Sequence, residues 1–276
     1  MNPHAAQPTS LLSLGKSFWK HRQLIKQMAW REVVGRYKGS VMGILWSFIN
    51  PVLMLAVYTF VFSVVFKAKW GVGGEESNTS FALILFVGLI VHGFLAEVLN
   101  RSPSLILSNI NYVKKVVFPL EILSVINLAA SLFHSVISLV VLLIASVAIN
   151  GYVPWTIILI PVVLFPLATL VTGLSWMLAS LGVFIRDIGQ TIGIITTVML
   201  FMSPVFFPLS AMPEKYQPFI LANPLTFIIE QAREVLLFGH LPNWSGLGIY
   251  MIIASTVAWF GYIWFQKTRK GFADVL

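Results

Sequence analysis

The most regular feature of the chain is a series of long apolar stretches separated by short, more polar segments. A helix that spans a membrane needs about 20 mostly apolar residues, because each residue adds about 1.5 Å and the hydrocarbon layer is about 30 Å thick. Six stretches reach this length, so the pattern predicts an all-α membrane protein with six transmembrane helices. They lie at residues 41–66, 81–99, 120–149, 155–185, 188–207 and 245–266.

The composition excludes a water-soluble globule. Hydrophobic residues make up 58% of the chain and charged residues only 10%, against about 25% charged residues in ordinary soluble domains. The chain has no Cys, which excludes disulfides, thiolate metal sites and thiol nucleophiles.

The positive charges indicate how the chain is oriented. With a cytoplasmic N-terminus, 14 of the 18 Lys and Arg residues fall in inward-facing segments and the other four in outward-facing ones. Cytoplasmic segments of membrane proteins carry such an excess. Residues 1–40 and 269–276 are therefore expected in the cytoplasm, on either side of a transmembrane domain at 41–268. Because the net charge of +8 then has a topological cause, we exclude nucleic acid as a partner.

Residues 10–37 are predicted to form one amphipathic helix, with basic residues along one stripe and apolar residues along another. Its pattern fits an anchor that lies on the inner leaflet, and it also fits a docking surface for a partner. The candidate residues of this interface helix are Phe18, Trp19, Trp30 and Arg31.

The cytoplasmic loop at 101–116 is more apolar than a solvated linker should be. A short helix from about Ser104 to Tyr112 would expose several apolar side chains to a groove on a cytosolic partner. Burial among lipid headgroups is the alternative. The candidate contact residues are Leu105, Ile106, Leu107, Ile110, Tyr112 and Lys114.

The outward-facing segment at 208–240 is apolar although it is rich in proline. Its pattern predicts two short helices, at 213–222 and 225–237, separated by Asn223 and Pro224. We expect this pair to dip back into the membrane; helices resting on the outer surface are the alternative. Glu230 and Arg233 could orient a lipid headgroup or pair with each other, and pairing is the favoured interpretation.

The predicted spans contain almost no chemistry of their own. His92 and His134 are the only ionisable residues well inside them, whereas ion-coupled transporters usually keep charged residues there. We find no metal-ligand spacing, no paired carboxylates, no catalytic triad and no phosphate-binding loop. The expectation is a chain that is not an enzyme, binds no metal or cofactor, and takes its energy from elsewhere.

Aromatic residues recur at helical spacing in the first predicted span, and three phenylalanines crowd the fifth. Rings of this kind most often contact lipid, but sugars have apolar C–H faces, and an aromatic-lined path could let a glycan slide. The candidate channel residues are Tyr58, Phe62, Phe66, Phe201, Phe206 and Phe207.

Six short motifs occur along the chain: the stretch from Arg36 to Trp46, Asn50-Pro51, the stretch from Val116 to Glu121, Arg186-Asp187, Ser203-Pro204-Val205 and Asn223-Pro224-Leu225. In this order, and with this topology, they resemble the permease subunits of type-2 ABC exporters of polysaccharide over nearly the whole chain. The resemblance is strongest to O-antigen permeases, with capsule and teichoic acid permeases close behind.

The resemblance implies a homodimer in the bacterial inner membrane, bound to two copies of a cytosolic ATPase that carries ATP and magnesium. It implies export of a polyprenyl-pyrophosphate-linked glycan along a channel lined by the first and fifth spans. Residues 10–37 and 101–116 would contact the ATPase, and two re-entrant helices would precede the last span. A membrane enzyme acting on polyprenyl-linked sugars is the alternative from another class.

Overall fold

The computed structural model describes residues 9–66, 70, 81–114 and 118–276, apart from the side chains of Leu11 and Lys114. These residues form helices and connecting turns, with no strand among them. Within this described part, five helical stretches are long and apolar enough to cross a membrane. They are Gly43–Val65, Phe81–Ser104, Ile122–Asn150, Trp155–Phe184 and Trp244–Val275.

Each stretch is built around one principal helix. The principal helices are α3 (Trp46–Tyr58, extended by a π-helix at Thr59–Val65), α4 (Phe81–Arg101), α6 (Ile122–Asn150), α7 (Ile160–Phe184) and α11 (Trp244–Thr268). The shorter helices are α1 (Leu11–Lys20), α2 (Arg22–Arg36), α5 (Ile110–Lys114), α8 (Ile188–Phe201), α9 (Gln217–Leu221), α10 (Pro224–Arg233) and α12 (Phe272–Val275). A second π-helix, Glu234–Phe238, follows α10.

The sixth predicted span, at 188–207, forms the apolar helix α8, which has only 14 residues. At about 1.5 Å per residue this helix is about 21 Å long, less than the thickness of the hydrocarbon layer. It ends early because the side-chain amide of Asn223 donates hydrogen bonds to the carbonyls of Met199 and Met202, both at 2.9 Å. The chain then turns through Ser203-Pro204. A sixth helix of spanning length is therefore not confirmed.

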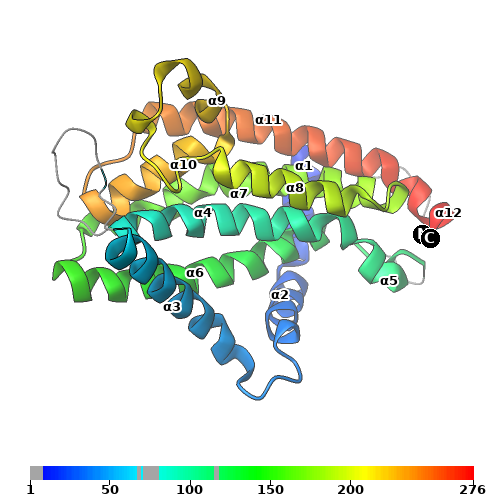
Figure 1. The fold of residues 1–276 in the computed structure, drawn as a ribbon. Helices are drawn as coiled ribbons and strands as arrows, with labels where there is room; N and C mark the ends of the chain where they lie inside the picture. The colour runs from blue at the N-terminus through cyan, green and yellow to red at the C-terminus, as the bar shows by residue number, and fades with distance from the viewer. Residues whose placement is uncertain (1–8, 67–69, 71–80, 115–117) are drawn as a thin grey trace.

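The helices α4, α6, α7, α8 and α11 run along the long axis of the molecule, whereas α1 and α2 run across it (Figure 1). The central element is α4, which contacts α6, α7, α8 and α10. In the most apolar 18-residue stretch of the span that contains α4, 72% of the residues are buried. In the corresponding stretch of the span that contains α3, only 6% are buried. Most of the surface of α3 is therefore left uncovered by its own chain.

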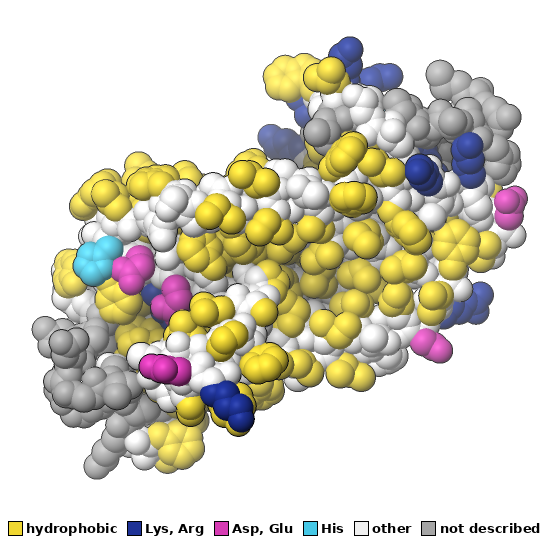
Figure 2. All heavy atoms as spheres, turned by 90° about the horizontal axis from the view of Figure 1, so that it is seen from above, with side chains coloured by type: hydrophobic (Ala, Val, Ile, Leu, Met, Phe, Trp, Pro, Cys, Tyr) yellow, Lys and Arg dark blue, Asp and Glu magenta, His cyan; other side chains and the backbone are white. Residues whose placement is uncertain are grey.

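Small residues allow α7 and α11 to pack closely. A Cβ atom at Gly173 would lie 2.5 Å from the Cα of Ala258, and one at Gly261 would collide with the backbone of Gly173. Glycine at both positions lets the two backbones approach, as in many helix pairs within membranes. Figure 2 shows a broad apolar surface in the middle of the molecule, with charged side chains gathered toward its two ends. This distribution fits a membrane-embedded middle.

A hydrophobic cluster apart from the main core joins helices near the two ends of the chain to residues 105–106 and 118–123. It contains Met28 of α2, Ile106, and Phe272 of α12, all buried. Phe272 is fully buried and makes an edge-to-face contact with Phe265, with 5.6 Å between ring centroids. The segment at 269–276, expected as a cytoplasmic tail, is therefore packed onto the bundle.

Candidate functional site

The structure brings five of the six candidate channel residues into one aromatic cluster. Phe62 lies 6.5 Å from Tyr58, 5.8 Å from Phe66 and 6.4 Å from Phe206, measured between ring centroids. Phe201 stacks on Phe206 at 5.6 Å. Residues from the first span, from the end of α8 and from the turn after it therefore form one continuous aromatic cluster. The spacing of Tyr58, Phe62 and Phe66 predicted this face.

Two further rings extend the cluster, and sequence reasoning missed them. Phe81, at the start of α4, stacks on Phe62 at 5.5 Å, and Trp70 lies 5.4 Å from Phe81. Phe207, the next residue after Phe206, is half-buried. Phe66 and Phe201 each expose more than 60% of their surface. The cluster thus has an open edge on which a sugar ring could stack.

Arg233 is the largest fully buried side chain in the described part of the protein. Its Nη1 atom lies 2.9 Å from Oε1 of Glu230, so the expected pairing of these two residues is confirmed. Its Nε donates to the carbonyl of Ile84 and its Nη2 to that of Val205, and its guanidinium lies over the ring of Trp70. A buried cation needs such partners. Arg233 therefore holds α10 to α4 and to the turn after α8.

The two short helices before the last span were predicted almost at their observed positions. Residues 214–221 form a 3₁₀ turn followed by α9, and α10 begins at Pro224. The apolar face of α10 is buried against α4 and α7, whereas Phe219 and Leu221 of α9 are exposed. Insertion of this pair into the membrane stays a prediction.

The described part of the loop predicted at 101–116, residues 101–114, is called the coupling segment below, and its structure differs from the prediction. Instead of one helix from Ser104 to Tyr112, two 3₁₀ turns (Ser102–Ser104 and Leu107–Asn109) precede α5. Leu105 and Ile106, which we expected to be exposed, are 9% and 0% exposed.

Glycine on a neighbouring helix explains the inward turn of this segment. A Cβ atom at Gly182 of α7 would collide with Pro103, so glycine there admits the backbone of the segment. Leu107 and Ile110 are half-buried, and Tyr112 stacks on Phe118 at 4.4 Å. The side chain of Lys114 lies outside the described residues. The accessible candidates are therefore Leu107, Ile110 and Tyr112.

The expected interface helix is divided into α1 and α2 by a turn at His21. Phe18 packs into the protein by stacking on Trp176 at 6.4 Å. Trp19 and Trp30 are 71% and 56% exposed. Arg31 donates a hydrogen bond to the hydroxyl of Tyr112, at 3.2 Å, and so links α2 to the coupling segment.

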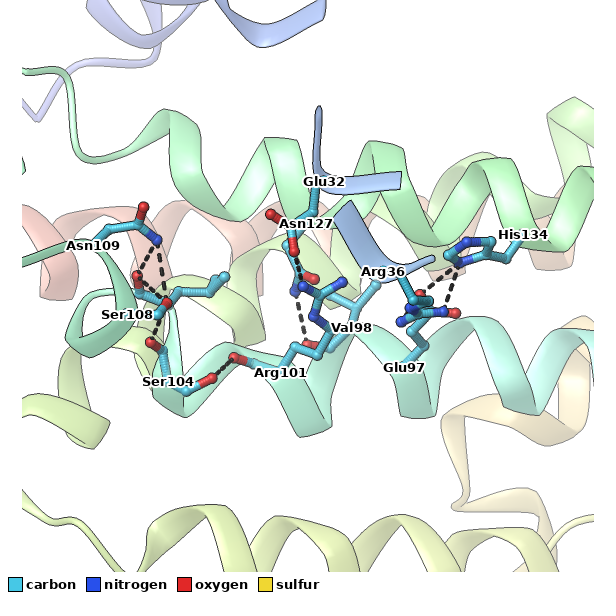
Figure 3. Close-up of polar contacts among 11 residues, drawn as sticks. Glu32, Arg36, Glu97, Val98, Arg101, Ser104, Ser108, Asn109, Asn127 and His134 are labelled. Carbon is cyan, nitrogen blue, oxygen red and sulfur yellow. Dashed lines mark hydrogen bonds and ion pairs between the residues drawn. The ribbon is translucent and has the colours of Figure 1, made fainter. Parts of the chain in front are cut away.

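A polar seam between α2, α4 and α6 was not predicted (Figure 3). We define it as Glu32, Arg36, Glu97, Arg101, Asn127 and His134. Two ion pairs join α2 to α4: Arg36 Nη2 lies 2.8 Å from Oε1 of Glu97, and Arg101 pairs with Glu32. Each helix carries a Glu followed four residues later by an Arg, and each Glu pairs with the Arg of the other helix. The repeated spacing of Glu and Arg is visible in the sequence. It does not show that these residues pair, because the partners are 61 and 69 residues apart in the chain.

His134 joins α6 to this seam. Its Nδ1 lies 2.9 Å from Oε1 of Glu97 and 2.9 Å from Nη1 of Arg36. The ring of Tyr37 meets His134 edge-on at 6.1 Å, and burial raises the pKa of the Tyr37 hydroxyl above its ordinary value. Asn127 donates from Nδ2 to the carbonyl of Val98. The seam therefore fastens α2 to two spanning helices.

Within the described ranges no group of three or more His, Cys, Asp or Glu side chains could hold a metal ion. The functional candidates in the described structure are therefore the aromatic cluster, the buried Arg233 and the polar seam.

The sequence matches the model of the family "ABC-2 type transporter" over residues 23–237. The chain belongs to this family of ABC transporter membrane subunits.

Among individual proteins, it is similar to the O-antigen export system permease protein RfbA of Myxococcus xanthus. The two are 27% identical over 266 residues, which cover 96% of this chain and 99% of that protein. It is 28% identical to an RfbA of Klebsiella pneumoniae, over 87% of this chain and 90% of that protein. It is 24% identical to the polysialic acid transport protein KpsM of Escherichia coli, over 87% of this chain and 91% of that protein.

Proposed function

We propose that this chain is the permease subunit of an ATP-driven ABC transporter that exports lipopolysaccharide O-antigen, linked to polyprenyl pyrophosphate, across the bacterial inner membrane. The observation that carries the proposal is the near full-length similarity to proteins named as O-antigen export permeases. The similarity to KpsM supports capsular polysaccharide as the second candidate substrate, at lower identity.

The aromatic cluster supports a role for the first span and α8 in the path of the glycan. The ring of Phe62 packs beside both Tyr58 and Phe206, and the apolar C–H faces of sugars stack on aromatic rings without tight binding of any one sugar. In the proposed homodimer this cluster lines the channel between the two subunits.

The energy would come from two copies of a cytosolic ATPase that bind ATP and magnesium. We propose that α1, α2 and the coupling segment contact this partner, with both termini in the cytoplasm. The burial of Ile106 changes how the segment would act. Its outer residues, Leu107 and Ile110, would meet the ATPase, while Leu105 and Ile106 anchor the segment in the bundle. Movement of the ATPase would then reach the spanning helices directly.

The experiment is deletion of the coding sequence in the native host, followed by complementation with the tagged wild-type chain. The expected result is loss and recovery of O-antigen on gels of lipopolysaccharide, with lipid-linked glycan accumulating inside the deletion strain. Loss of capsule with intact O-antigen would select the second candidate. An unchanged cell surface would refute the proposal.

A second measurement tests the motor. The tagged chain, purified in mild detergent from its host, should bring down a cytosolic ATPase and hydrolyse ATP as a complex. A chain that purifies alone and without hydrolysis would remove the ATPase from the proposal.

A further inference from the structure

A cavity of about 370 Å³ lies between α3, α4 and α6. The aromatic cluster consists of rings alone, whereas the walls of this cavity combine aromatic rings with side chains that can form hydrogen bonds. Ligand sites in proteins typically have volumes of about 300–1,000 Å³ and a few convergent polar groups on apolar walls. The lining residues used below are Asn50, Tyr58, Glu97, His134 and Ser138.

Two polar side chains in the wall retain hydrogen-bonding capacity. Nε2 of His134 is buried and has no hydrogen-bond partner among the described residues. Buried nitrogen atoms are rarely left in this state, because an unmade hydrogen bond costs about 1–3 kcal/mol. Glu97 uses Oε1 for its contacts with both Arg36 and His134. Its second carboxylate oxygen is thus the remaining acceptor.

The charges favour a neutral ligand. Glu97 is paired with Arg36, so the carboxylate is compensated before any ligand enters. A phosphate group in the cavity would face this carboxylate. A polyhydroxyl ligand, in contrast, can donate to Glu97, exchange hydrogen bonds with His134 and Asn50, and stack on Tyr58.

We propose that this cavity is a carbohydrate subsite that holds a short, uncharged segment of the glycan by its hydroxyl groups. Glu97 and His134 bind the hydroxyls, and Tyr58 supports the apolar face of a sugar ring. The inference rests on the proposed function, because it takes the exported glycan as the ligand. Tyr58 also belongs to the aromatic cluster, where it lies 6.5 Å from Phe62. The subsite is therefore continuous with the proposed channel.

The absence of Cys from the chain makes a direct occupancy measurement possible. The variant Ser138→Cys places a single thiol in the cavity wall. Val140→Cys, two residues further along α6 on an exposed surface, is the matched control. Both are prepared in membranes from a host that lacks its surface polysaccharide. The rate of modification by a small methanethiosulfonate reagent is then measured with and without added oligosaccharide.

The probe is the oligosaccharide repeat released by mild acid from the host's own surface polysaccharide. At a concentration of about four times Kd it should slow labelling of Ser138→Cys about fivefold and leave Val140→Cys unchanged. Equal labelling rates with and without the oligosaccharide at Ser138→Cys would overturn the inference. Protection by inorganic phosphate but not by oligosaccharide would also overturn it, since the cavity would then be an anion site.

A filling variant tests the same cavity by transport. Ser138→Phe should occupy the space and strongly reduce surface polysaccharide, while Val140→Phe exports normally. Normal export by both variants would overturn the inference and leave the proposed function standing. If the wild-type chain itself restores no polysaccharide to a deletion strain, the proposed function fails. The labelling result does not depend on export by the Phe variants or on whether they fold.

Discussion

Replacement of Arg233 by Met removes the charge from the most deeply buried cation of the described structure while keeping an apolar side chain of similar length. The change deletes the ion pair with Glu230 and the hydrogen bonds to the carbonyls of Ile84 and Val205. Breaking a buried pair by removing one partner costs about 3–5 kcal/mol. The side chain of Glu230 is 36% exposed, so water offsets part of this loss. We therefore expect a cost near the lower limit, about 3 kcal/mol.

The assay is the apparent melting midpoint of the detergent-purified chain, followed by loss of the size-exclusion peak after heating. For a protein of this size, 1 kcal/mol corresponds to roughly 2–4 °C, so Arg233→Met should lower the midpoint by roughly 6–12 °C. Arg186→Met, at an exposed position in the turn before α8, is the control and should change it little. Equal midpoints for the two variants would refute the assignment of Arg233 as a structural link.

Three further outcomes are expected. Arg101→Glu should lower the melting midpoint and the added exchange Glu32→Arg should restore part of it, because the reversed pair reforms; a double variant no more stable than the single one would contradict the ion pair. Phe62→Ala should reduce surface polysaccharide in a complementation assay while the exposed Phe60→Ala does not, and equal export would count against the aromatic path. Ile110→Asp should leave the chain inserted but abolish co-purification of the ATPase; retained co-purification would remove this residue from the contact.

Local patterns predicted much of the fold. Apolar runs located the five long helices, because a span needs only length and hydropathy. The Asn223-Pro224 step located the start of α10, since proline fits the first turn of a helix and asparagine caps it. The side chain of Asn223 does accept a hydrogen bond from the backbone of Leu225.

Contacts between distant segments were not predictable in the same way. The early end of α8 depends on Asn223, which lies 21 and 24 residues beyond the carbonyls that it caps. Burial of Ile106 depends on the space left by Gly182 on another helix. The polar seam joins residues more than 60 positions apart. The sequence shows His134 as a single histidine inside a span and does not show its contact with Glu97, which places it in the polar seam.

The sparse packing of α3 has a consequence for how this protein evolves. Only 6% of residues in the most apolar stretch of that span are buried, so most substitutions along it cost the isolated subunit little packing energy. Selection on exposed α3 positions such as Leu53 must therefore act through what surrounds the helix. Among related chains, a face of α3 that resists variation would mark contact with another molecule, whereas conservation along α4 would report internal packing.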